Sequence, residues 1–175
     1  MTPGVSTIDF TELAAFVARV DGLPCWRAYT SAGNSPGLLL GRKVRRAQAD
    51  AMKDHHRWKD LPPDSDRFFT SEVLFIAWCS WRLDGEDQPI SSSDDSEGSA
   101  SAAIGELAGT SLKSAKVSAP AGDLELRFSN GQCLRVFCDH VPGDPSFDGN
   151  WELRVDRSHV MVGPGAQCRY AEEDT

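Results

Sequence analysis

The segment Asp123–Asp139 decides the fold, because apolar and polar residues alternate on both sides of a turn in its sequence, DLELRFSNGQCLRVFCD. A two-residue turn at Asn130-Gly131 would divide the apolar side chains between the two faces of the hairpin. A three-residue loop that begins at Ser129 instead places four of them on one face, in the opposing pairs Leu124 with Val136 and Leu126 with Leu134. We therefore predict a β-hairpin with a type I turn, a bulge and Gly131 in the left-handed conformation.

Other parts of the chain also have strand patterns. The run Val73–Cys79 is apolar at both alternating sets of positions, which is typical of a central strand covered on both faces. Further strands are predicted around the turn at 31–37, where they form a second hairpin, at 112–117, and as a pair at 151–155 and 160–162. The sheet should therefore be rich in antiparallel pairs.

The first segment before the strands has the pattern of a helix. Asp9 and Glu12 have the spacing of a capping box, and apolar residues then recur at helical intervals, at positions 13, 16, 17 and 20. Gly22 is placed to end the helix in a left-handed conformation. The predicted fold class is α+β, an antiparallel-rich sheet with this N-terminal helix packed on it.

The domain organisation follows from length and from a weak internal similarity. A chain of 175 residues fits a single domain, 1–175. Two similar halves, 8–88 and 103–170, are possible, because each has a helix, a glycine, two strands, a glycine turn and a later strand with a tryptophan. Residues 89–102 are acidic, rich in serine and poor in apolar residues. Their composition predicts a flexible linker between the halves.

Charge is unevenly distributed along the chain. The net charge is −8, composed of +3 over residues 1–60, −8 over 61–109 and −3 over 110–175, and a basic stretch occupies 42–59. An acidic chain is not expected to bind nucleic acid directly, because that affinity comes from contacts between cations and phosphates. A basic protein partner is favoured instead. The candidate partner-binding residues are the acidic ones of the middle segment, Asp84, Glu86, Asp87, Asp94, Asp95 and Glu97.

Motifs that would indicate catalysis or a cofactor are absent from the sequence. There is no phosphate-binding loop, nucleophile elbow, zincin motif or dinucleotide fingerprint, so no catalytic residue, cofactor or metal is assigned. The five cysteines have no disulfide-framework spacing, and the N-terminus shows no secretory signal. The longest apolar run is too short to span a membrane. The expected location is the cytoplasm, with no membrane association.

A second hypothesis rests on cysteine and histidine. Cys138 and His140 lie close together in the sequence and could provide a nucleophile and a base. Buried cysteines with a surface histidine are the more ordinary explanation of this pattern. Tryptophans on strands are likewise expected to fill the core, although one exposed beside the acidic segment would be an interface anchor.

Four sequence stretches carry a resemblance to known proteins: GLPCW at 22–26, FIAWCSWR at 75–82, LRFSNG at 126–131 and WEL at 151–153. Together they resemble a family of small bacterial proteins of uncharacterised function, and similar glycine-turn and W-x-L patterns occur in immunity proteins of bacterial toxin systems. The resemblance implies a non-enzymatic inhibitor that neutralises a toxin domain by protein–protein binding. It assigns no functional residue. The alternatives are a small-ligand-binding protein or enzyme with the Cys138–His140 site, and a subunit of a bacterial defence assembly.

Overall fold

The computed structural model describes residues 5–49, 59–140, 142–143 and 149–172. In these residues β-strand is the predominant secondary structure, and the strands join into one 12-stranded antiparallel sheet. In chain order the helices and strands are β1 (Ser6–Thr7), α1 (Phe10–Val17), β2 (Pro24–Ser31), β3 (Ser35–Arg45), β4 (Phe69–Ala77), β5 (Ser80–Asp84), β6 (Pro89–Ser92), α3 (Glu97–Gly105), β7 (Thr110–Ser118), β8 (Asp123–Phe128), β9 (Cys133–Phe137), β10 (Trp151–Val155), β11 (Ser158–Val162) and β12 (Cys168–Glu172).

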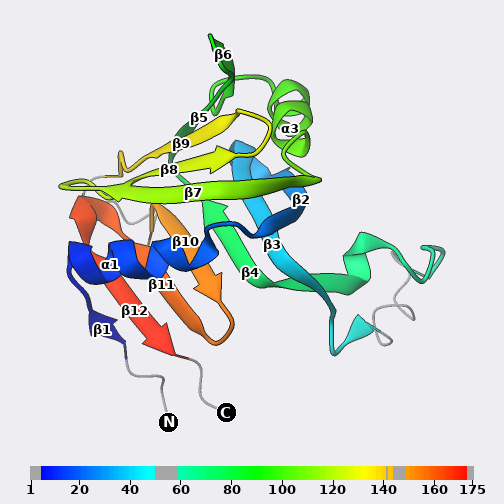
Figure 1. The fold of residues 1–175 in the computed structure, drawn as a ribbon, viewed down its shortest axis with the longest axis horizontal. Helices are drawn as coiled ribbons and strands as arrows, with labels where there is room; N and C mark the ends of the chain where they lie inside the picture. The colour runs from blue at the N-terminus through cyan, green and yellow to red at the C-terminus, as the bar shows by residue number, and fades with distance from the viewer. Residues whose placement is uncertain (1–4, 50–58, 141, 144–148, 173–175) are drawn as a thin grey trace.

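The sheet folds over on itself into two layers. Its strand order is β1-β12-β11-β10-β4-β3-β2-β7-β8-β9-β5-β6, and the junction between β2 and β7 holds only the pairs Pro24–Ser111 and Cys25–Thr110. Figure 1 shows β7, β8, β9 and β5 running across one layer, and β2, β3, β4 and β10–β12 crossing beneath it at a steep angle. Both layers contribute to the hydrophobic core, with Phe75 and Trp151 from one and Trp81 and Leu134 from the other.

The hairpin that decides the fold has the predicted register. Leu124 lies opposite Val136 and Leu126 opposite Leu134, and all four side chains are buried. Gly131 adopts the left-handed conformation with φ 85°, and its N–H donates to the Phe128 carbonyl. The three-residue loop is therefore confirmed.

The central strand is also confirmed. β4 lies between β3 and β10, and Val73, Phe75 and Ala77 point into the core. The expected cover on both faces is wrong, because Leu74 and Ile76 on the other face are only partly buried. The fold class is confirmed only in its coarser part, since the antiparallel sheet and the N-terminal helix are present but helices are few and short. The protein is mostly β rather than an even mixture of helix and sheet.

The N-terminal helix begins as the capping box predicts. The Glu12 N–H donates to Asp9 Oδ1 over 2.8 Å, and the Asp9 N–H donates to Glu12 Oε2 over 2.9 Å. Leu13, Phe16 and Val17 form its buried face. A 3-10 turn, residues 18–20, continues α1, and Gly22 follows with φ 82°.

The predicted flexible linker, residues 89–102, is wrong as a description of this segment. It forms β6 and the first turns of α3, whose N-cap is Ser96 with its side chain accepting from the Ser99 N–H. Ala100 and Ala103 are buried, and α3 as a whole contacts β2 and β6. Small alanines need little apolar area to pack closely, so the low hydrophobicity of the segment hid a helix that tertiary contacts stabilise.

The strand pairing of the first half recurs in the second. β2, β3 and β4 pair in succession, as do β7, β8 and β9, and both initial hairpins have a register shift, after Cys25 in one and after Leu112 in the other. Each half then passes its next strand to the other layer, where β5 pairs with β9 and β10 pairs with β4. The helices follow the same pattern. α1 of the first half contacts β7 of the second, and α3 of the second half contacts β2 of the first.

Hydrogen bonds at the junction between the layers show the same correspondence between the two halves. The Gly22 N–H donates to the Leu112 carbonyl over 2.6 Å, and the Gly109 N–H donates to the Cys25 carbonyl over 2.7 Å. Both glycines have positive φ, 82° and 86°, which a residue with a side chain rarely adopts. Matching backbone contacts therefore join the two halves at the β2–β7 junction.

Two buried tryptophans occupy corresponding places in the halves. Trp81 begins the W-x-L sequence of β5, and its Nε1 donates to the Asn34 carbonyl over 2.7 Å. Trp151 begins that of β10, and its Nε1 donates to the Gly122 carbonyl over 2.8 Å. Each indole thus links a strand to the turn of the first hairpin of its own half. The turn residue that accepts the hydrogen bond, Asn34 or Gly122, has positive φ in both cases.

Part of the basic stretch, residues 50–58, lies outside the described residues. Among those described, no helix has the length and apolar character needed to cross a membrane.

Candidate functional site

The six acidic residues proposed for partner binding lie at one end of the molecule. They occupy the end of β5, the β5–β6 turn and the connection from β6 into α3, at the top of Figure 1. We call residues 84–97 the acidic end. Two of its six carboxylates have side-chain partners among the described residues, and four have none there.

Asp84 belongs to an ion-pair network on the outer face of its sheet layer. Its carboxylate accepts from Arg82 Nε over 2.7 Å and from Arg135 Nε over 2.8 Å. The hydrogen bonds from Arg82, together with the one from Arg135, lower the pKa of Asp84 below its ordinary value. Glu125 extends the network by bonding Arg127 and Arg135. The charge of Asp84 is therefore balanced locally, and this residue is a poor source of attraction for a partner.

Asp95 has a structural role. Its carboxylate accepts from Ser91 Oγ over 2.7 Å and from the Ser92 N–H over 3.1 Å, and its own N–H donates to the Ser92 carbonyl. The hydrogen bond from Ser91, followed by that from Ser92, lowers the pKa of Asp95. Because β6 is the last strand of the sheet, this turn uses backbone groups that an added strand would need.

The remaining four carboxylates are exposed, and among the described residues their side chains have no hydrogen-bond or ion-pair partner. They are Glu86, Asp87, Asp94 and Glu97. Beside them Ile90 is 43% exposed, one of two large hydrophobic side chains with such exposure in the described chain. Ile90 lies against Gly85 in the β5–β6 turn. The acidic end therefore combines an apolar side chain with four exposed carboxylates. Two of them, Glu86 and Asp87, line a hollow that Arg82, Arg127 and Arg135 also line.

The alternative site, Cys138 with His140, lies at a shallow hollow of ≈320 Å³ that both residues line. The Cys138 thiol donates to the Gly122 carbonyl over 3.2 Å, and His140 Nδ1 lies 3.3 Å from the Gly149 carbonyl. The Cys138 thiol thus has contacts with the Gly122 carbonyl and with Cys79.

The buried cysteines near this hollow are poor nucleophiles. Cys79 is hydrogen-bonded to Cys138, and this contact together with burial raises the pKa of the Cys79 thiol. Burial also raises the pKa of Cys168. A raised pKa keeps the thiols protonated at neutral pH, and a protonated thiol neither attacks a carbonyl nor binds a metal well. In the described part of the chain no cluster of metal-ligating side chains occurs.

None of the tryptophans in the described residues is an exposed anchor. Trp81 and Trp151 are buried in the core, while Trp26 and Trp78 are half-buried. The indole of Trp26 donates to Ser71 Oγ over 3.1 Å. The apolar side chain beside the acidic segment is Ile90 instead.

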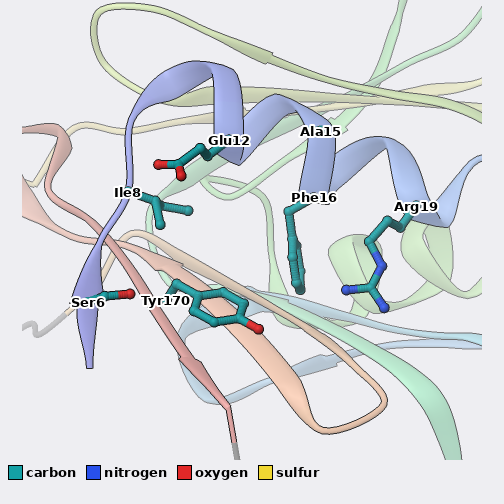
Figure 2. A pocket seen from close by; sticks show the side chains of 7 residues that line it. All are labelled: Ser6, Ile8, Glu12, Ala15, Phe16, Arg19 and Tyr170. Carbon is teal, nitrogen blue, oxygen red and sulfur yellow. The ribbon is translucent and has the colours of Figure 1, made fainter. Parts of the chain in front are cut away.

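A groove of ≈500 Å³ lies between α1 and β12. Figure 2 shows side chains that line it, among them Phe16, Arg19 and Tyr170. The rings of Phe16 and Tyr170 meet edge to face with centroids 6.0 Å apart, and the Arg19 guanidinium lies 4.9 Å from the Phe16 centroid. Tyr170 Oη also bonds Ser158 Oγ. The side chains of Phe16, Arg19 and Tyr170 thus contact one another or the sheet. We therefore interpret the groove as a consequence of the packing of α1 on the sheet.

A cleft that the sequence did not indicate lies on the outer face of β2, β3 and β4. Arg27, Arg46 and Arg67 line it, and its volume is ≈630 Å³. The three arginines are far apart in the sequence, and Arg46 alone belongs to the basic stretch. Sheet pairing brings them together.

Comparisons with protein-family models, with curated proteins and with solved structures gave no match for this chain.

Proposed function

We propose that this chain is a non-enzymatic binding protein whose acidic end contacts a basic protein partner in the cytoplasm. The observation that supports the proposal is the exposed Ile90 on the last strand of the sheet, next to four carboxylates without an internal partner. Protein interfaces commonly place an apolar anchor within a polar rim, and charge complementary to the partner guides the encounter.

The binding mode follows from the edge of β6. Asp95 uses the backbone of Ser92, so a partner strand cannot extend the sheet along the full length of β6. Contact would therefore be made by side chains, with Ile90 entering an apolar depression of the partner. Glu86, Asp87 and Asp94 would face its lysines and arginines.

The most specific form of the proposal is an immunity-type inhibitor of a bacterial toxin domain. The resemblance to immunity proteins suggests it, and the acidic end is consistent with it because toxin domains that act on nucleic acid are basic. An inhibitor of this kind neutralises by covering its partner's surface and needs no catalytic group of its own.

The experiment is affinity capture from the native host followed by binding kinetics on the captured protein. A triple variant, Glu86→Gln with Asp87→Asn and Asp94→Asn, should slow association several-fold at low salt. The difference should shrink near ~0.5 M salt, where the Debye length falls to a few ångströms. Ile90→Ser should chiefly accelerate dissociation. The matched control replaces three exposed carboxylates elsewhere, as Asp60→Asn, Asp64→Asn and Glu172→Gln.

Equal slowing by the control triple would refute the assignment of the acidic end, because net charge alone would then explain the rate. If the partner is a toxin, co-expression of the wild-type chain should restore growth. Cys138→Ala and His140→Ala variants that remain folded should restore it equally well. Loss of protection in either of them would favour the cysteine–histidine hypothesis.

A further inference from the structure

Three segments of the chain each bring one arginine to the cleft on the outer face of β2–β4. Arg27 lies on β2, Arg46 follows the end of β3, and Arg67 lies in the 3-10 turn Asp66–Phe68 before β4. No aspartate or glutamate is among the residues that line the cleft. The chain as a whole has a net charge of −8, whereas the charged residues that line this cleft are all positive.

The guanidinium groups are available for a ligand. The side chains of Arg46 and Arg67 have no ion-pair or hydrogen-bond partner among the described residues. Arg27 makes one long hydrogen bond, 3.5 Å, to the Asp66 carbonyl. The Asp66 carboxylate is bound to Lys43 Nζ over 2.6 Å instead. Like charges gathered in a hollow repel one another, and an anion bound between them removes that cost.

The orientation of Arg27 depends on a close packing contact. Its guanidinium lies 5.2 Å from the centroid of the Tyr29 ring, which also lines the cleft. The Tyr29 ring in turn lies directly against the backbone of Gly37 on β3. A Cβ at position 37 would be only 2.5 Å from Tyr29 Cζ. Glycine at this position allows the ring to lie flat, and the ring supports the arginine.

The floor of the cleft is apolar. Leu39 and Leu74 are directly paired across β3 and β4, and both point to the outer face. Thr30 and Thr70 are also among the residues that line the cleft. A volume of ≈630 Å³ is within the range of small-molecule sites and exceeds what a single inorganic ion needs.

We propose that this cleft binds a small phosphorylated molecule, with its phosphate groups between Arg27, Arg46 and Arg67. The planar guanidinium fork matches phosphate oxygens with two parallel hydrogen bonds, and three such groups suit an anion of more than one charge. The organic part of the ligand lies on Leu39 and Leu74. This site is separate from the acidic end and does not depend on the proposed partner binding.

The test is calorimetric titration of the full chain with inorganic pyrophosphate at constant ionic strength. Saturable binding at one site is expected for the wild type. Arg46→Gln and Arg67→Gln should each raise the dissociation constant for pyrophosphate tenfold or more, because a charge-assisted hydrogen bond is lost. Neither side chain has a structural partner in the described residues, so both variants should keep the melting temperature of the wild type.

Arg169→Gln is the matched control, since Arg169 is exposed on β12 and does not line the cleft. It should bind pyrophosphate as the wild type does, and so should the Glu86→Gln variant of the acidic end. Absence of saturable binding at millimolar pyrophosphate would overturn the proposal. So would equal weakening by Arg169→Gln, because binding would then follow net charge rather than the cleft.

Discussion

The two buried indoles offer a sharp test of the two-layer fold. Replacing Trp81 or Trp151 by phenylalanine removes the N–H that bonds a turn carbonyl, Asn34 O in one case and Gly122 O in the other. Leaving a buried acceptor unsatisfied costs about 1–3 kcal/mol. The smaller ring and the void beside it cost about 1–2 kcal/mol more. Because Trp81 and Trp151 are 2% and 0% exposed, water cannot easily replace either contribution.

We therefore expect each variant to lose roughly 3 kcal/mol, a fall in melting temperature of about 6–12 °C for a chain of this size. Urea unfolding followed by circular dichroism measures the loss without relying on tryptophan fluorescence. Trp26→Phe is the control, because Trp26 is half-buried and bonds the Ser71 hydroxyl, and it should lose only about 1 kcal/mol. The reasoning fails if either core variant loses no more free energy than the control.

Two further predictions concern single residues. Gly122→Ala should destabilise the protein by more than about 2 kcal/mol, whereas Gly131→Ala should cost about 1 kcal/mol, both measured by urea unfolding. Both glycines have positive φ, but only a Cβ at position 122 would meet a neighbour, Val162 Cγ1, at 2.7 Å. Asp84→Asn should cost about 1 kcal/mol near pH 7. Since the Arg82 contact lowers the pKa of Asp84 from 3.8, its stabilisation is present above that pH and lost as the pH falls further. The stability difference between wild type and Asp84→Asn should therefore shrink as the pH falls below 3.8, and a difference that stays constant over that range would contradict the ion-pair explanation.

Local pattern was sufficient wherever one face of an element had to be buried. The hairpin at Asp123–Asp139 was predictable to the residue because only one register places Leu124, Leu126, Leu134 and Val136 together. The capping box of α1 was equally local, since Asp9 and Glu12 satisfy each other. Such features need no knowledge of the rest of the fold.

Composition misled where tertiary contact decides the structure. The segment 89–102 has too few apolar residues to fold alone, yet α3 forms because Ala100 and Ala103 pack against the rest of the protein and Ser96 caps the first turn. The acidic candidates could not be separated by sequence either. Asp84 and Asp95 differ from their neighbours only through partners, Arg135 and Ser91, that the folded strands supply.

The arginine cleft could not be predicted from the sequence either. Arg27 and Arg46 lie within the first sixty residues, where they are two of nine basic residues, and Arg67 lies in the acidic middle segment. A single arginine on an outward strand position carries no signal by itself. Their convergence becomes visible only when β2, β3 and β4 are paired.

The proposal that the acidic end is an interface is tested most directly by site-specific photo-crosslinking in the native host. A photoreactive residue placed at Ile90 should give a covalent adduct with one basic protein. The same residue placed at Val5, the other exposed large hydrophobic of the described chain, should not. The Ile90 adduct should weaken when Glu86, Asp87 and Asp94 are neutralised. Identical adducts from both positions, or none from position 90, would contradict the account.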